Sequence, residues 1–314
     1  MIDSPRAFAR LLKLGFFLKK IGASKLGRPF LRMAGLPILA EMDAHTDEAP
    51  LRNLDDLMAD REEPQNPSYR YFAPCGPRYL FPRVGEASMK ALDSLIGPGT
   101  YLNNPCCGLL AHNYGDLADA RELAKRNILL AENNGNEQIM ADCSSCASFL
   151  KTYPQLFLQP EEASWRRRAE AFSQRVRDVI EVYGENAAKL PPDVRSGVET
   201  TYHDSCRAIN GQNIKEGPRK AARRAAGASF CEMAGSDQCC GGAGAFGFTH
   251  GGLSDELLRK KTANVASVQA GLVLTSATSC LIQLARGLRK YYPEAKVLHL
   301  SEFVAGALEK KHGA

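Results

Sequence analysis

Nine of the ten cysteines in this 314-residue chain fall into a repeated pattern. In the first half, a single cysteine precedes a Cys–Cys–Gly corner and a Cys–X–X–Cys pair, and the five cysteines are Cys75, Cys106, Cys107, Cys143 and Cys146. The second half repeats this order with Cys206, Cys239, Cys240 and Cys280, and Ala277 stands where a fifth cysteine is expected. Matching positions lie 131 to 134 residues apart. Such a constant period indicates a duplicated domain.

Five thiols in one half favour a metal cluster. A Cys–X–X–Cys pair is the usual start of a metal site, and adjacent cysteines point apart, so a Cys–Cys–Gly corner can reach two metal atoms of one cluster. Zinc takes four ligands and would leave a fifth thiolate without a partner, whereas iron–sulfur clusters accept several thiolates. The four thiols of the second half leave a cubane cluster, zinc or a degenerate structural site open. Cys231 lies outside both patterns, and we interpret it as a buried small hydrophobic residue.

Composition and charge exclude several classes of protein. With 44% hydrophobic and 24% charged residues, the chain is typical of globular proteins rather than disordered ones. It has no run of about 18 apolar residues that would predict a transmembrane helix, and a net charge of +5 gives no reason to expect nucleic-acid binding. Lys13 interrupts the apolar N-terminal stretch, which favours an amphipathic helix over a signal peptide. We therefore expect reduced thiols and a cytoplasmic location.

Strand and helix patterns alternate in the same order in both halves. We expect short strands at residues 69–73, 138–141, 200–202 and 272–275, and helices at residues 82–95 and 218–226. Further helices follow the Cys–Cys–Gly corners, with Asp116 and Ser254 as their expected N-caps. Alternating elements predict an α/β fold with parallel sheets, and ligands bind at the carboxyl ends of such strands, where these cysteines fall.

This order divides the chain into four segments. They are an N-terminal extension over residues 1–68, a first domain over 69–160, a connecting helix and linker over 161–198, and a second domain over 199–314. The extension is basic over residues 1–40 and acidic over 41–64. We leave open whether this extension packs against the rest of the chain or contacts a partner protein or a membrane surface. The glycine-rich run 241–247 lacks the Lys–Ser/Thr ending of a phosphate loop, so we expect it to wrap closely around a cluster rather than to bind a nucleotide.

The sequence resembles the cysteine-rich, Cys–Cys–Gly domain family over residues 70–310, approximately. The resemblance rests on the nine cysteines and on the segments 76–86, 202–206, 238–242 and 259–264. Members of this family include the B subunit of heterodisulfide reductase, the iron–sulfur subunit of glycolate oxidase, lactate utilisation protein A, and the C subunit of anaerobic glycerol-3-phosphate dehydrogenase. The resemblance implies two tandem domains with short parallel sheets flanked by helices.

The same resemblance implies particular cofactors and partners. In the B subunit of heterodisulfide reductase, each five-cysteine motif holds a noncubane cluster. By this likeness the first five cysteines would hold a noncubane iron–sulfur cluster of the 4Fe-4S type, and Cys206, Cys239, Cys240 and Cys280 would hold a 4Fe-4S cluster or zinc. The glycolate-type members carry an N-terminal ferredoxin domain, and the absence of cysteine before Cys75 implies a separate ferredoxin-like subunit instead.

Three functional hypotheses follow from these features. The main one is an oxidoreductase subunit like the B subunit of heterodisulfide reductase, which acts on a thiol or disulfide substrate and needs ferredoxin-like and flavoprotein partner subunits. The alternative is the iron–sulfur subunit of a lactate- or glycolate-oxidising system, which passes electrons from a flavoprotein to quinone. The third is a structural adaptor with zinc in both halves. Peripheral contact with the inner face of the membrane is left open for the first two.

Overall fold

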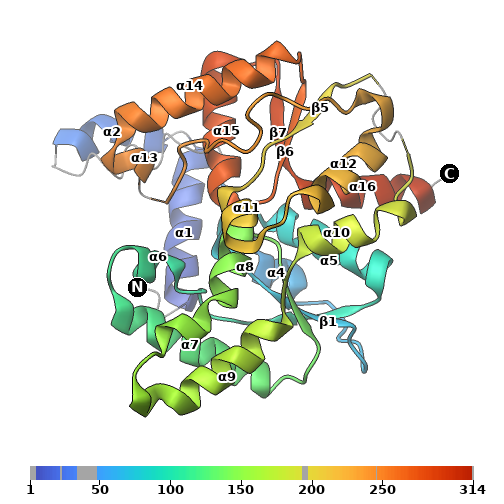
Figure 1. The fold of residues 1–314 in the computed structure, drawn as a ribbon. Helices are drawn as coiled ribbons and strands as arrows, with labels where there is room; N and C mark the ends of the chain where they lie inside the picture. The colour runs from blue at the N-terminus through green and yellow to red at the C-terminus, as the bar shows by residue number, and fades with distance from the viewer. Residues whose placement is uncertain (1–4, 22, 34–47, 193–196, 245, 313–314) are drawn as a thin grey trace.

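The computed structural model describes residues 5–21, 23–33, 48–192, 197–244 and 246–312. Two α/β halves account for most of these residues, and Figure 1 shows the first half in the lower part of the view and the second half above it. Each half contains a sheet of parallel strands with helices around it. The expected α/β fold with two short parallel sheets is confirmed.

The first sheet has the strand order β2-β1-β3-β4, and all neighbouring strands are parallel. Its strands are β1 (Tyr69–Phe72), β2 (Gly99–Leu102), β3 (Gln138–Ala141) and β4 (Val176–Asp178). Its helices are η1 (Gly76–Leu80), α5 (Pro82–Ile96), α6 (Leu109–Asn113), α7 (Leu117–Glu132), α8 (Ser144–Lys151), η2 (Tyr153–Leu156), η3 (Pro160–Glu162), α9 (Ala163–Arg175), α10 (Val179–Glu185) and η4 (Ala187–Lys189).

The second sheet has the strand order β5-β6-β7 and is also parallel. Its strands are β5 (Thr200–Tyr202), β6 (Leu272–Thr275) and β7 (Lys296–His299). Its helices are α11 (Cys206–Gln212), α12 (Glu216–Ala226), η5 (Gly227–Ser229), α13 (Phe246–Thr249), α14 (Gly251–Ser267), α15 (Thr278–Tyr291) and α16 (Leu300–His312). A parallel bridge between Thr200 and Phe230 occupies the place that β2 has in the first sheet. The two halves therefore share one topology.

The helix caps confirm one expectation and correct another. Asp116 caps α7, because its carboxylate accepts a hydrogen bond from the backbone N–H of Asp119 at 3.0 Å. The expectation that Ser254 caps the corresponding helix is wrong. Helix α14 begins three residues earlier, at Gly251, and the buried Ser254 hydroxyl donates instead to the carbonyl of Gly241 at 2.9 Å. This serine binds the cysteine loop rather than the helix end.

The connecting segment is not a single helix. Helix α9 ends at Arg175, and the next three residues form β4, the fourth strand of the first sheet. Asp178 then caps α10, accepting a hydrogen bond from the N–H of Ile180 at 3.3 Å. The apolar residues of this segment do face the core, since Phe172, Val179 and Ile180 are buried.

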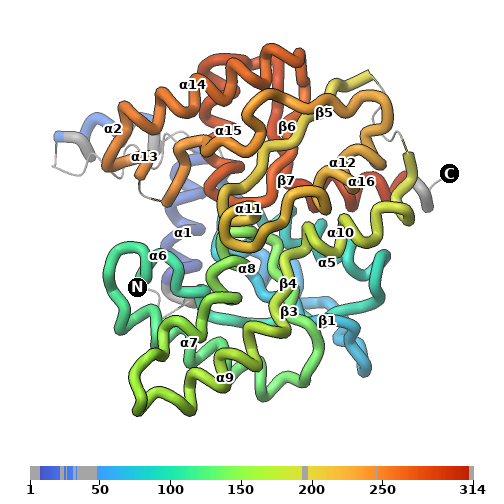
Figure 2. Tube along the Cα trace, viewed as in Figure 1, coloured from blue at the N-terminus to red at the C-terminus, as the bar shows by residue number. Residues whose placement is uncertain are grey.

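The last helix of each half packs on the first long helix of the other half. Helix α16 lies against α5, and α10 lies against α12, as Figure 2 shows on the right of the view. The α10–α12 contact is close enough to require glycine, because a Cβ on Gly184 would lie 2.3 Å from the Cα of Gly217. Tyr183 donates a hydrogen bond to Ser301 at 2.9 Å across the same boundary. These two helix–helix contacts join the two halves, and the buried residues of both halves form one hydrophobic core there.

The described part of the N-terminal extension consists of helices α1 (Pro5–Lys20), α2 (Ala23–Met33) and α4 (Leu54–Met58). Helix α1 contacts the first half, since the rings of Phe8 and Tyr79 pack edge to face with centroids 5.3 Å apart. Lys13 also forms an ion pair with Asp56 at 2.6 Å. The first seven residues of the acidic part, 41–47, lie outside the described residues. None of the described helices combines the length and apolar character that crossing a membrane requires.

Candidate metal centres

The first half brings its five expected thiols together at one edge of the sheet. Three neighbouring parallel strands, β1, β2 and β3, end at this edge, and each is followed within five residues by one or two of the cysteines. The thiols form a chain of neighbours in the order Cys75, Cys106, Cys107, Cys146 and Cys143. The Sγ atoms of Cys107 and Cys146 are 3.4 Å apart. We call these five residues the first centre.

The Cys–Cys–Gly corner of the first centre has a fixed backbone. Gly108 adopts a φ of +88°, a conformation that favours glycine, and its N–H donates to the Sγ of Cys106 at 3.5 Å. The side-chain amide of Asn127 donates to the carbonyl of Cys106 at 3.0 Å, and the Tyr153 hydroxyl donates to the carbonyl of Cys107 at 2.7 Å. These contacts fix the backbone that carries both thiols.

A buried arginine holds the loop that leads to this corner. The guanidinium of Arg78 donates to the carbonyl of Asn104 and to the side chain of Asn103, both at 2.5 Å. Its third partner is the carboxylate of Asp55, at 2.9 Å. Because Arg78 is three residues after Cys75 and its two asparagine partners are just before Cys106, it fixes the loops that carry these two cysteines relative to each other.

Two thiols of the first centre are readily deprotonated. The neighbouring thiols of Cys107 and Cys75 and the N–H of Gly108 lower the pKa of Cys106 to about 3. The thiol of Cys146 lowers the pKa of Cys143 to about 6, although burial opposes this shift. Since the thiolate is the form that binds metals, these two thiols are the ones prepared to bind a metal at neutral pH, whereas neighbouring thiols and burial raise the pKa of Cys75, Cys107 and Cys146.

The second half gathers its four expected thiols in the same way. Its chain of neighbours is Cys206, Cys239, Cys240 and Cys280, which we call the second centre. Gly241 repeats the geometry of the first corner, with a φ of +82° and an N–H that donates to the Sγ of Cys239 at 3.3 Å. The thiols of Cys206 and Cys240 lower the pKa of Cys239 to about 2.

A histidine that the cysteine pattern does not predict lies beside the second centre. His203 is buried, and one of its ring nitrogens lies within 4.8 Å of the Sγ atoms of Cys240 and Cys280. Sequence reasoning gives one signal for it, since His203 stands at the end of a strand and three residues before Cys206. That position alone is equally typical of a histidine in the protein core.

Buried ion pairs hold the loops of the second centre. Asp204 is 1% exposed and accepts hydrogen bonds from both terminal nitrogens of Arg219, one of them at 2.8 Å. The same guanidinium donates to the Ser236 hydroxyl at 2.9 Å. The buried Lys261 ammonium donates to the carbonyls of Gly235 and Ser236. The segment before Cys239 is therefore tied to the segment before Cys206.

The glycine-rich run after Cys240 lies close to two helices. A Cβ on Gly241 would be 2.8 Å from the carbonyl oxygen of Ser254 in α14, and one on Gly242 would be 2.8 Å from that of Ser279 in α15. Because α15 carries Cys280, these contacts bring the corner against the last thiol of the second centre. The run therefore packs beside the thiols, and residue 245 lies outside the described residues.

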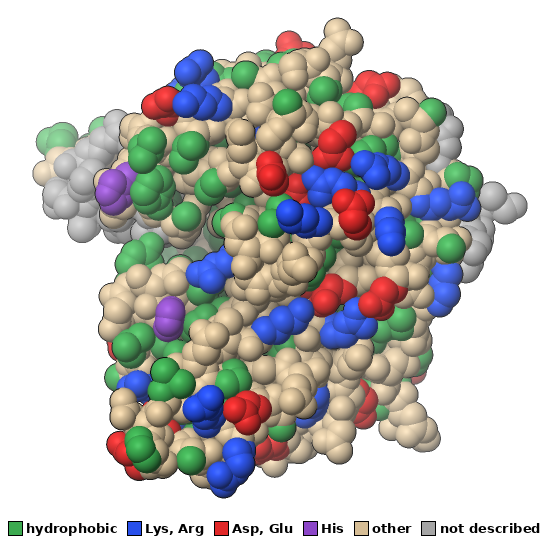
Figure 3. Space-filling view, viewed as in Figure 1, with side chains coloured by type: hydrophobic (Ala, Val, Ile, Leu, Met, Phe, Trp, Pro, Cys, Tyr) green, Lys and Arg blue, Asp and Glu red, His purple; other side chains and the backbone are tan. Residues whose placement is uncertain are grey.

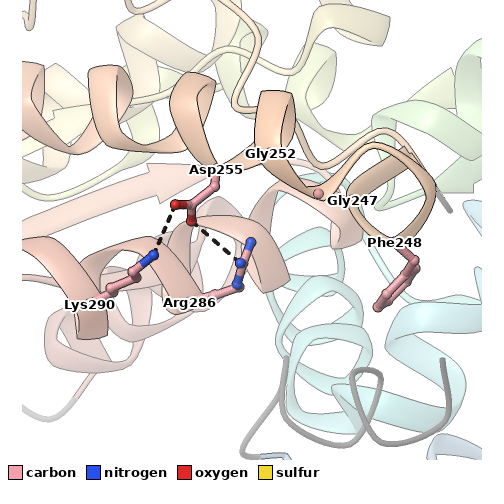
Figure 4. A pocket seen from close by; sticks show the side chains of 7 residues that line it. Gly247, Phe248, Gly252, Asp255, Arg286 and Lys290 are labelled. Atoms are coloured by element: carbon pink, nitrogen blue, oxygen red, sulfur yellow. Dashed lines mark hydrogen bonds and ion pairs between the residues drawn. The ribbon is translucent and has the colours of Figure 1, made fainter. Parts of the chain in front are cut away.

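A surface hollow beyond this run offers no comparable set of ligands. Figure 4 shows its lining, with Asp255 between Arg286 and Lys290. The carboxylate of Asp255 forms ion pairs with both cations, at 3.4 Å and 2.9 Å. The charged groups of this hollow are thus already paired with one another, and nine of the ten cysteines lie in the two centres instead.

The tenth cysteine stays apart from both centres. The Sγ of Cys231 lies 3.6 Å from the carbonyl of Thr200 and 3.8 Å from that of Val268. It is partly buried and packs against the core, which agrees with its interpretation as a small hydrophobic residue. All ten cysteines are free of disulfide bonds.

In each centre one cysteine is exposed and a second, Cys106 or Cys206, is partly exposed. Cys75 and Cys239 are exposed, whereas Cys107, Cys143, Cys146, Cys240 and Cys280 are buried. Figure 3 shows that the molecule is hollowed between its two halves, with hydrophobic side chains on both edges of the hollow. A group held by either centre would be enclosed on the side of the buried thiols and open on the side of the exposed and partly exposed ones.

The donor sets fit a metal cluster. Five convergent thiols exceed the four ligands of zinc, and soft sulfur donors suit iron and sulfide. Each backbone-fixed corner pairs a buried thiol, Cys107 or Cys240, with a less buried thiol of lowered pKa, Cys106 or Cys239, and none of them is in a disulfide, which is an arrangement that suits such a cluster. The role of each cysteine as a ligand stays a prediction.

Comparisons with known proteins agree with the duplicated pattern. The chain is 28% identical over 256 residues to a probable glycolate oxidase iron-sulfur subunit of Bacillus subtilis, and the match covers 79% of this chain and 56% of that protein. It is 29% identical over 244 residues to a lactate utilization protein A of an Exiguobacterium species, covering 75% of this chain and 96% of that protein. The sequence profile of the cysteine-rich (CCG) domain matches twice, over residues 69–151 and 200–285. The chain therefore belongs to the cysteine-rich, CCG domain family.

Proposed function

We propose that this chain is the iron–sulfur subunit of a lactate- or glycolate-oxidising system and passes electrons from a flavoprotein toward quinone. The names of its relatives support this substrate class, since one is a probable glycolate oxidase iron-sulfur subunit and another a lactate utilization protein. The observation that carries the proposal is the meeting of five thiols, from three separate loops, in the first centre. Such a donor set suits an iron–sulfur cluster.

The interpretation as a heterodisulfide reductase subunit has less support. The relatives named above act, by their names, in glycolate oxidation and lactate utilization. The second centre also has the buried methyl group of Ala277 in place of a fifth thiol, so the chain lacks the doubled five-cysteine set found in the B subunit of heterodisulfide reductase. Both observations favour electron transfer for a hydroxy-acid dehydrogenase over disulfide cleavage.

The chain's own residues position and tune the two centres. When bound, an iron–sulfur cluster supplies one-electron transfer at a potential set by burial and by hydrogen bonds to sulfur. Here the N–H groups of Gly108 and Gly241 point at Cys106 and Cys239. The surrounding hydrophobic core excludes water from the buried thiols. The exposed Cys75 and Cys239 give each centre one side open toward a partner protein.

Anaerobic purification with iron and sulfide analysis tests the proposal. We expect a brown protein with more than about four irons per chain, since two centres are filled, and an electron paramagnetic resonance signal that changes on reduction. Adding lactate or glycolate together with the flavin-dependent dehydrogenase of the same system should reduce the clusters. A colourless protein that holds only zinc contradicts the proposal and supports a structural adaptor.

Cysteine variants show whether the first centre is responsible. Cys107→Ser and Cys146→Ser should each lose iron and the corresponding signal, because the two sulfurs are neighbours in the buried part of the centre. Cys231→Ser is the matched control, since Cys231 lies outside both centres and contacts backbone carbonyls. Equal iron content in all three variants would place the cluster elsewhere.

A further inference from the structure

The second centre lacks a donor at the position that Cys143 occupies in the first. Ala277 is the residue directly before α15, as Cys143 is the residue directly before α8, and both have extended backbone. Ala277 is fully buried, so its methyl group takes the place of a buried thiol. The first centre has five sulfur donors, and the second has four.

A second difference between the halves occurs one strand away. Phe72 ends β1 and His203 directly follows β5, and each stands three residues before the first cysteine of its centre. Their surroundings match, since Phe72 pairs with Ala141 in β3 and the N–H of His203 donates to the carbonyl of Leu274 in β6 at 2.8 Å. Both side chains are 1% exposed.

The two differences are reciprocal. The first half combines an apolar ring at Phe72 with a thiol at Cys143, and the second half combines an imidazole at His203 with a methyl group at Ala277. Each half therefore has five potential donors for soft or borderline metals. Imidazole nitrogen is a ligand for iron as well as for zinc, so this exchange keeps the number of donors constant.

The imidazole of His203 is placed as a ligand would be. Its nitrogen and the sulfurs of Cys240 and Cys280 lie within 4.8 Å of one another. Among the described residues, neither buried ring nitrogen of His203 has a nitrogen or oxygen partner, and the polar group that the imidazole does influence is a thiol of the centre, since Cys240 and this imidazole both help to lower the pKa of Cys280. A buried polar group without a partner is unfavourable, and coordination to a metal would satisfy one of the two nitrogens.

We propose that His203 is a ligand of the second centre and completes, with Cys206, Cys239, Cys240 and Cys280, a four-thiolate, one-imidazole site for an iron–sulfur cluster. This inference rests on the proposed function, because it requires a cluster rather than zinc. It carries a consequence for electron flow. Replacing thiolate by neutral imidazole raises the reduction potential of a cluster, so the second centre has the higher potential and receives electrons from the first.

Pulsed electron paramagnetic resonance of the anaerobically purified chain, labelled with ¹⁵N-histidine, tests the ligand directly. We expect the reduced protein to show a histidine nitrogen coupling that changes with the isotope. His203→Phe, which introduces the residue of the first half, should lose this coupling and roughly half of the iron. His250→Ala is the matched control, because His250 is exposed and stacks on Phe246, and it should keep both.

A double variant separates loss of a ligand from loss of the fold. Adding Ala277→Cys to His203→Phe reproduces the donor set of the first centre, so the iron should return without the nitrogen coupling and with a more negative midpoint potential. A wild-type protein with both centres loaded and no histidine coupling would overturn this inference alone. A wild-type protein without iron would overturn the proposed function and this inference with it.

Discussion

The hydroxyl of Thr278, in the second half of the chain, donates a hydrogen bond to the Sγ of Cys143 in the first half, at 3.7 Å. Thr278 begins α15, and Cys280 of the second centre follows two residues later. One turn of helix therefore contacts both centres. Ser144 repeats the connection in the opposite direction, with its N–H donating to the carbonyl of Ser276 at 2.9 Å. The two centres thus share a boundary of a few residues, which suits electron transfer between them.

Removing this hydroxyl should change the first centre without emptying it. Thr278→Val keeps the β-branched shape and loses the donor to Cys143. Because hydrogen bonds to sulfur stabilise the reduced, more negative cluster, we expect the midpoint potential of the first centre to become more negative at unchanged iron content. A redox titration followed by electron paramagnetic resonance measures this shift.

The control for this experiment is Thr249→Val, at an exposed threonine of the same half. This variant should leave the midpoint potentials of both centres unchanged. A Thr278→Val protein with the wild-type potential would show that the contact at 3.7 Å has no electrostatic effect on the first centre.

Gly76 is the residue that allows Thr278 to come so close. A Cβ on Gly76 would lie 2.1 Å from the hydroxyl oxygen of Thr278 and 2.6 Å from its Cβ. Because the second distance involves an atom next to the backbone, the helix start itself would have to move. Gly76→Ala should therefore destabilise the chain by about 1–3 kcal/mol, as overpacking does, and lower the iron content of the first centre. Thermal unfolding and iron analysis measure the two effects.

Gly251→Ala provides the comparison, because a Cβ on Gly251 would meet no atom within 4 Å. Surface substitutions of this kind change stability by no more than about 0.5 kcal/mol. Equal stability of the two alanine variants would mean that the boundary between the centres tolerates an added methyl group.

The repeated cysteine spacing was sufficient to predict most of this arrangement. Strands β3, β5 and β6 have the expected bounds, and their cysteines follow at the sheet edge where ligands of parallel strands gather. The prediction succeeds because the Cys–X–X–Cys and Cys–Cys–Gly motifs determine the local backbone conformation at the positions of their thiols. The glycines after both corners, Gly108 and Gly241, both have a left-handed φ, so the two copies of the motif share one backbone conformation.

The parts that sequence reasoning did not predict depend on packing between distant segments. Strand β4 is three residues long, too short for an alternation pattern, and it interrupts apolar residues that keep helical spacing on both sides. The role of Ser254 follows from the close approach of Gly241, which no local pattern shows. The match between Phe72 and His203 becomes visible only when the two halves are compared strand by strand.

Among the residues that hold the loops of the second centre, Arg219 should be the one whose substitution destabilises the chain most. Its guanidinium pairs with the carboxylate of Asp204, which is 1% exposed. Arg219→Met would leave that charge buried and unpaired, which typically costs about 3–5 kcal/mol, and should release iron from the second centre first. Thermal unfolding and the isotope-sensitive histidine coupling report the two effects separately.

The neighbouring Arg223 serves as the matched control. It pairs with Glu232 at 3.4 Å, but its side chain is 52% exposed, so Arg223→Met should cost no more than about 1 kcal/mol. If both methionine variants were equally stable and equally loaded, the buried pair would not be what holds the loops of the second centre.

A buried carboxyl group at the boundary of the two halves should make stability depend on pH. Burial raises the pKa of Asp178 to about 7, from an ordinary value of 3.8, and the nearby Glu181 carboxylate adds to the shift. Between these two values the folded chain keeps a proton that the unfolded chain has released. Stability from this group is therefore present at low pH and is lost as the pH rises toward 7.

Asp178→Asn removes the titrating group and keeps an oxygen that can accept from Gln212, which lies 2.9 Å away. Asp142 is also buried with its pKa raised to about 7, whereas burial lowers the pKa of His299 to about 4, which acts in the opposite direction. The variant should therefore lose only the part of the fall in unfolding temperature between about pH 4 and 7 that Asp178 contributes. Glu185→Gln, at a side chain that is 58% exposed, should keep the full fall. An unchanged slope in Asp178→Asn would mean that this carboxyl group is ionised in the folded chain throughout that range.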